Sequence, residues 1–119
     1  MSEEIPKVLV IGGTELLWQC WQHIFAGKAE LICAQSLDKG WEMFMANDFA
    51  AIVVEALSGG TIADTEDFVR DIRVGFDGPI VGLSTELTYR TRLQGAGCSH
   101  KCGNAAVPDI ICMVLGIHR

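Results

Sequence analysis

Hydrophobic and polar positions alternate along this chain in blocks. Short runs of apolar residues are followed by longer segments of mixed polarity, five times over. The short runs are bounded by turn residues and indicate strands, whereas the longer segments begin at helix-capping residues such as Thr14, Ser36 and Thr61. The pattern predicts strands over residues 7–11, 30–34, 50–55, 80–84 and 98–101, and helices over residues 14–26, 36–46, 61–74, 86–94 and 107–117.

Strict alternation of strands and helices predicts parallel strands joined by right-handed crossovers. The strands over residues 7–11, 50–55 and 80–84 are apolar almost throughout, which is typical of strands covered on both faces. We therefore expect a three-layer α/β/α sandwich. The chain contains no linker, repeat or low-complexity segment, so we expect a single domain over residues 1–119.

Composition narrows the possible partners. The 119 residues are half hydrophobic and carry a net charge of −6, which disfavours direct contact with nucleic acid. No apolar run approaches the ~20 residues that span a bilayer. The amino terminus lacks the pattern of a signal peptide, so we expect a cytoplasmic protein with no membrane contact. An odd number of cysteines, five, argues against a disulfide framework, and we expect most of them to be buried.

Polar side chains that could bind a ligand or react lie where the predicted strands end. Glu55 ends the third strand, Ser84 ends the fourth and Lys101 ends the fifth. The first strand is followed by Gly12 and Gly13. Because the carboxyl ends of parallel strands meet at one edge of a sheet, we expect these residues to form one site.

Taken with these strand ends, the element order resembles the receiver domain of bacterial two-component response regulators. The resemblance covers almost the whole chain and implies a flavodoxin-like sheet of order 2-1-3-4-5. In such domains an acidic pair follows the first strand and a phosphorylated aspartate ends the third. Those places fall here on Gly12, Gly13 and Glu55. The remaining signature places fall on Ser84 for the hydroxyl switch residue, Cys98 for the aromatic switch residue and Lys101 for the lysine.

Only the serine and the lysine match the receiver pattern. Magnesium prefers carboxylate and water oxygens, and Gly12 and Gly13 supply none, so we expect no metal site and no cofactor. Glu55 carries an extra methylene, and a displaced carboxylate is a poor phosphoacceptor. The resemblance therefore implies a degenerate, non-enzymatic pseudo-receiver that signals through protein partners, with homodimerisation as a possibility. Glu55 then either imitates a phosphoaspartate or simply pairs with Lys101.

Three alternatives stay open. In the first alternative, the domain still accepts phosphate, with Glu15 or Glu55 restoring a metal site. In the second, the turn at residues 12–14 binds a nucleotide or another small ligand, although its spacing is not G-x-G-x-x-G. In the third, zinc is bound by Cys98, His100 and Cys102, although an extended strand would hold the two cysteines ~13 Å apart.

Two helices carry more apolar residues than one buried face needs, so each either packs widely in the core or exposes an edge that binds a partner. The first helix has a stripe of Leu17, Cys20, Trp21 and Ile24, extended by Trp18 and Phe25, and the second is crowded by Trp41, Met43, Phe44 and Met45. The helix over residues 86–94 offers Tyr89, Arg90 and Arg92 as a polar contact face.

Overall fold

The computed structural model describes residues 5–118, and it confirms the predicted architecture. The strands are β1 Lys7–Ile11, β2 Glu30–Ala34, β3 Ala51–Glu55, β4 Ile80–Leu83 and β5 His100–Cys102. The helices are α1 Glu15–Ile24, α2 Leu37–Ala46, α3 Ile62–Gly75, α4 Leu87–Ala96 and α5 Val107–Leu115, the last preceded by the short 3₁₀ helix η1 Asn104–Ala106. All strand pairs are parallel, and the sheet has the order β2-β1-β3-β4-β5.

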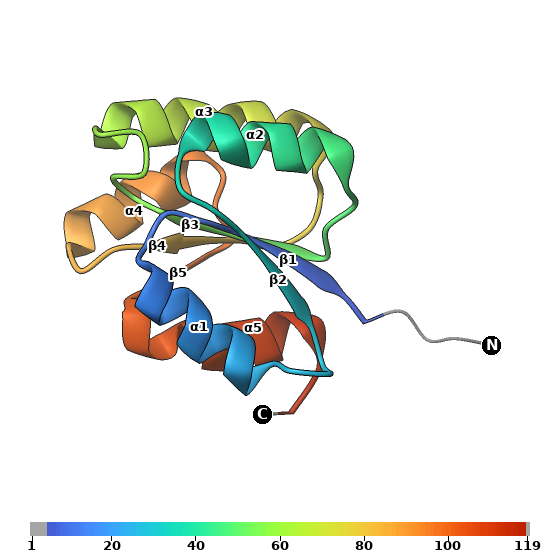
Figure 1. Ribbon diagram of the computed structural model, residues 1–119. Coiled ribbons are helices and arrows are strands. Elements are labelled where there is room, and N and C mark those ends of the chain that lie inside the picture. The colour runs from blue at the N-terminus through green and yellow to red at the C-terminus, as the bar shows by residue number, and fades with distance from the viewer. Residues whose placement is uncertain (1–4, 119) are drawn as a thin grey trace.

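The helices cover both faces of this sheet, with α1 and α5 on one side and α2, α3 and α4 on the other (Figure 1). Side chains of a strand alternate between its two faces. In β1, Leu9 and Ile11 therefore pack towards α2, α3 and α4, whereas Val8 and Val10 pack towards α1 and α5. All four are buried, which explains why the strand is apolar throughout.

Three predicted helix starts are confirmed by their caps. Thr14, Ser36 and Thr61 each accept a hydrogen bond from the backbone N–H three residues on, at 3.3, 3.2 and 3.1 Å. Each cap satisfies a backbone donor that the first helical turn leaves without a partner. None of the helices in residues 5–118 is both long and apolar enough to cross a lipid bilayer.

The predicted start of the fifth strand is wrong. Helix α4 continues two residues beyond the expected Gln94 and ends at Gly97, whose φ of +138° suits glycine. The backbone N–H of Cys98 then donates to the Leu93 carbonyl at 3.0 Å, so it caps the helix and does not join the sheet. As a result β5 begins at His100, and Cys98 lies before the strand on which the receiver resemblance placed it.

The cysteines are less uniformly buried than expected. Cys98 and Cys102 are buried and Cys33 and Cys112 are half-buried, but Cys20 is exposed. Cys20 therefore drops out of the apolar arc predicted on the first helix. The rest of that arc lies in the core or packs against it, namely Leu17, Trp18, Trp21, Ile24 and Phe25. Burial raises the pKa of the Cys33 thiol to about 11 and that of Cys98 to about 12, although Arg73 partly opposes the shift at Cys98.

We expect alkylation to distinguish these thiols. The thiolate is the reactive form, so a buried thiol with a raised pKa reacts slowly in the folded protein. Iodoacetamide at mildly alkaline pH should label Cys20 first, and should label Cys98 only after denaturation. Peptide mapping by mass spectrometry measures the order, and rapid labelling of Cys98 in the native protein would contradict the described packing.

Arg73 fastens the end of α3 to two neighbouring turns. Its Nε and Nη2 donate to the Gly97 carbonyl at 3.0 and 2.7 Å. Its Nη1 donates to the carbonyls of Phe76 and Gly78 at 2.9 and 2.6 Å. One planar guanidinium therefore satisfies three backbone carbonyls around the α3–β4 turn and the end of α4.

Arg73→Lys should lower the free energy of unfolding by roughly 1–2 kcal/mol, since an ammonium group cannot reach all three carbonyls together. Arg70→Lys is the matched control. Arg70 is exposed and pairs with Asp67 at 3.0 Å, and such surface pairs contribute less than ~1 kcal/mol. Urea unfolding of both variants measures the difference, and equal losses would refute the fastening role.

Candidate functional site

The turn after β1 leaves no room for a side chain at Gly12. Gly12 and Gly13 have φ angles of +85° and +88°, which other residues rarely adopt. A Cβ atom added to Gly12 would lie 2.3 Å from the Oγ of Ser58 and 2.8 Å from the Cβ of Glu55. The first place of the expected acidic pair is therefore occupied by a side chain from the loop after β3.

That side chain, Ser58, joins the ends of the two central strands. Its hydroxyl lies 2.6 Å from the carbonyl oxygen of Glu55 and 3.2 Å from that of Ile11, both acceptors. Ser58 is not among the residues that the sequence pattern singled out, because its partner Ile11 lies 47 positions away.

Glu55 lies at the end of β3 as expected and is half-buried. Its Oε2 accepts a hydrogen bond from the backbone N–H of Leu57 at 3.2 Å, so the carboxylate turns towards its own loop. The alternative pairing with Lys101 is not formed among residues 5–118. Strand β4 separates the two residues, and Lys101 is exposed in the middle of β5, opposite Gly82.

Trp18 closes the same turn from the side of α1. Its indole Nε1 donates to the carbonyl of Gly12 at 2.8 Å. A Cβ atom on Gly13 would lie 3.5 Å from this nitrogen, an ordinary contact. The half-buried Trp18 therefore belongs to the site, whereas the sequence suggested only core packing or an exposed edge.

Ser84 is buried at the end of β4, and its bonding is with the backbone. Its Oγ accepts from the N–H of Glu86 at 3.0 Å, and its carbonyl accepts from Nε of Arg90 at 2.6 Å. A Cβ atom on Gly103 would lie 2.8 Å from Nη2 of Arg90, so the guanidinium covers the ends of both β4 and β5. Burial raises the pKa of the Cys102 thiol, and the positive charge of Arg90 partly opposes this shift.

The polar contact face predicted on α4 is largely engaged within the protein. Arg90 points to the strand ends, and Arg92 forms an ion pair with Glu66 of α3. Tyr89 packs against the core formed with α2 and α3. These three residues therefore tie α4 to the rest of the fold.

Within residues 5–118, no group of three histidine, cysteine, aspartate or glutamate residues is arranged to hold a metal ion. At the carboxyl edge of the sheet, the single acidic side chain among the predicted site residues is that of Glu55. Gly12, Glu55 and Ser84 lie where β1, β3 and β4 end, and each is hydrogen-bonded within the chain. Lys101 instead lies exposed within β5, and Cys98 precedes that strand. The site can present a fixed surface, and it offers no set of oxygen ligands for a hard cation.

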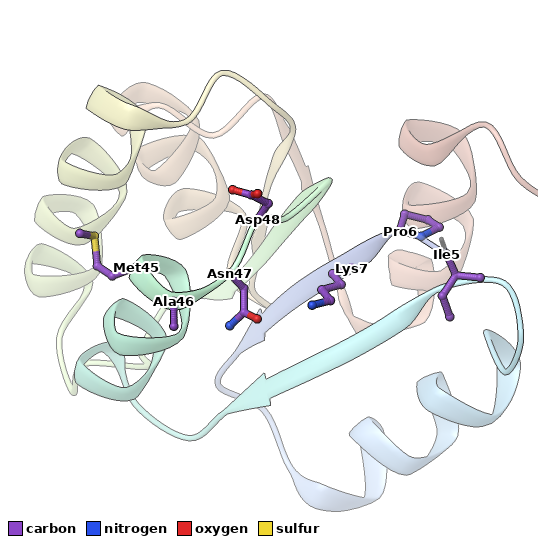
Figure 2. Close-up of a pocket in the computed structure, with 7 residues that line it drawn as sticks. All are labelled: Ile5, Pro6, Lys7, Met45, Ala46, Asn47 and Asp48. Atoms are coloured by element: carbon purple, nitrogen blue, oxygen red, sulfur yellow. The ribbon is translucent and has the colours of Figure 1, made fainter. Parts of the chain in front are cut away.

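A hollow lies at the opposite end of the sheet. It measures about 550 Å³ and opens where β1 begins and α2 ends. Figure 2 shows Lys7 at the start of the strand and Asn47 and Asp48 in the segment that leads to β3. Parallel α/β sheets bind ligands at their carboxyl ends, so this hollow is separate from the predicted site.

No family model matches the chain, and no curated protein matches it. Solved structures do match. A two-component response regulator from Clostridium difficile superposes with a TM-score of 0.79 at 16% identity, covering 93% of this chain and 96% of that one. A response regulator from Thermotoga maritima gives 0.79 at 12% identity, covering 95% and 99%. A chemotaxis response regulator of Vibrio cholerae gives 0.76 at 15%, covering 93% and 99%. The chain thus has the flavodoxin-like fold of response regulator receiver domains.

Proposed function

We propose that this chain is a receiver-fold signalling module that works through protein–protein contacts, without phosphorylation of a carboxylate and without enzymatic activity. The observation that carries the proposal is the position of Ser58, whose hydroxyl fills the space above Gly12. In the receiver pattern that space belongs to an acidic side chain. In this chain the Ser58 side chain joins the ends of β1 and β3.

The chemistry of phosphoryl transfer supports this reading. Transfer to a carboxylate needs a positioned nucleophile and a cation that neutralises the charge of the transferring group. Glu55 is the one carboxylate at the expected nucleophile position, and it is bonded to the N–H of Leu57. Gly12 and Gly13 provide no side-chain oxygen to a cation beside it.

The backbone carbonyls at this edge already have hydrogen-bond donors within the chain. The carbonyls of Ile11 and Gly12 are bonded to Ser58 and Trp18, and that of Ser84 is bonded to Arg90. A module held in this way presents one constant surface to its partner. We propose a cytoplasmic signalling protein or an output domain as that partner.

Incubation with acetyl phosphate and magnesium tests the proposal. We expect no phosphoryl adduct by intact mass spectrometry, because Gly12 and Gly13 offer no side-chain oxygen to a cation and the Glu55 carboxylate is bonded to its own loop. A receiver with an intact aspartate, treated in parallel, is the positive control. A stable adduct that disappears in Glu55→Gln would overturn the proposal.

Substitution of Gly12 tests whether Ser58 and Glu55 fill the space that a side chain at position 12 would need. Gly12→Ala should lower the free energy of unfolding by about 2–4 kcal/mol, through its positive φ and the collision with Ser58. Gly60→Ala is the matched control, since Gly60 has a φ of +92° but nothing within 4 Å of an added Cβ. That control should cost only about 1 kcal/mol, the strain of the backbone alone. Denaturant unfolding measures both.

A double variant separates the collision from other effects. Ser58→Ala should partly rescue Gly12→Ala, because it removes the atom nearest to the added methyl group while the contact with Glu55 persists. Equal destabilisation by Gly12→Ala and Gly60→Ala, with no rescue, would show that the space above Gly12 is open.

A further inference from the structure

A groove between α2 and α3 combines an apolar floor with an acidic rim. It measures about 390 Å³. The two helices lie side by side over the same face of the sheet (Figure 1). The residues that line this α2–α3 groove are Leu37, Asp38, Trp41, Asp64, Asp67, Phe68 and Asp71.

Trp41 forms an exposed and well-supported part of the floor. Its ring lies edge-on to that of Phe68, with centroids 6.3 Å apart, and 5.7 Å from that of Phe44. Even so, 40% of Trp41 is exposed, and its indole N–H has no hydrogen-bond partner in residues 5–118. Leu37 lies one helical turn earlier, is half-buried and also lines the groove. The aromatic cluster therefore fixes the indole while leaving an apolar edge open to a partner.

The rim of the groove carries negative charge that the protein hardly neutralises. Asp67 pairs with Arg70 at 3.0 Å. The carboxylates of Asp38, Asp64 and Asp71 make no ion pair or hydrogen bond with any residue from 5 to 118. All the charged residues that line the groove are acidic. An occupant with positive charges beside an apolar face would complement this surface.

The groove adjoins a second hollow that reaches the candidate site. Leu37, Asp38 and Asp64 also line a second hollow, which extends to Ser58 and Gly59 in the loop after β3. The surface thus runs from the middle of α3 to the loop that closes the turn at Gly12. A surface of this extent suits a segment of a protein better than a small cation.

We propose that the α2–α3 groove binds a basic amphipathic helix of a partner protein. Apolar side chains of that helix would pack on Trp41 and Leu37, which line the groove, as in other complexes that seat a helix in a groove. Its arginine or lysine residues would reach Asp38, Asp64 and Asp71, and one of them can stack on the indole face. This inference adds a contact surface to the proposed function and does not depend on the chemistry at Glu55.

A fluorescently labelled peptide of leucine and arginine, designed to form an amphipathic helix, is a suitable probe. Anisotropy should show binding to the intact chain, weakened about tenfold or more in Asp64→Asn/Asp71→Asn. The matched control is Asp48→Asn/Asp77→Asn, which removes the same charge outside the groove. The control should bind like the unsubstituted chain. In a ¹⁵N NMR spectrum, the peptide should shift the Trp41 indole signal more than those of Trp18 and Trp21.

Several results would overturn the proposal. Absence of binding would do so, as would equal weakening by the two double variants, which would indicate general attraction to an acidic protein. Equal affinity for a peptide with glutamate in place of arginine would exclude charge complementarity. A Trp41 signal that shifts with protein concentration alone would mean that a second copy covers the groove. None of these results bears on the acetyl phosphate experiment, so the two proposals fail separately.

Discussion

The backbone carbonyls at the carboxyl ends of the central strands need hydrogen-bond donors, and the side chains that supply these donors determine the local structure. A parallel ladder ends where its strands diverge, and a buried acceptor left without a donor costs roughly 1–3 kcal/mol. Side chains from three different helices or loops supply the donors. The Ser58 hydroxyl lies within hydrogen-bond distance of the carbonyls of Ile11 and Glu55. The Trp18 indole donates to the carbonyl of Gly12, and the Arg90 guanidinium donates to that of Ser84. These bonds bring α1, α4 and the loop after β3 to a single edge.

The same edge is where parallel α/β folds place their ligands. The backbone groups at this edge can therefore either bond to the protein's own side chains or contact a ligand. In this chain they bond to the side chains of Ser58, Trp18 and Arg90. Among the described residues, no buried side-chain nitrogen or oxygen lacks a hydrogen-bond partner. The fold itself rests on strands that are apolar on both faces, and this core is separate from the strand-end chemistry.

The sequence was sufficient for features that depend on neighbouring residues. Parallel pairing follows from the alternation of strands and helices, whereas the sheet order came from the receiver resemblance. The caps at Thr14, Ser36 and Thr61 act within one helical turn. It was insufficient where distant segments meet. The bond between Ser58 and Ile11 joins residues 47 positions apart, and no local pattern encodes it. The late start of β5 depends on the cap that Cys98 makes with Leu93, a tertiary choice between helix and sheet.

The contact between Ser58 and Gly12 also constrains how this sequence can change by mutation. An acidic residue at position 12 would force Ser58 or Glu55 to shift, since its Cβ would lie 2.3 Å from the Ser58 hydroxyl oxygen and 2.8 Å from the Cβ of Glu55. Loss of Ser58 alone removes a hydrogen-bond donor from two strand-end carbonyls. Each single step towards a metal-binding pocket therefore passes through a less stable protein. A change at position 12 alone and a change at position 58 alone therefore each lower stability, so we expect these two positions to be substituted together among related sequences.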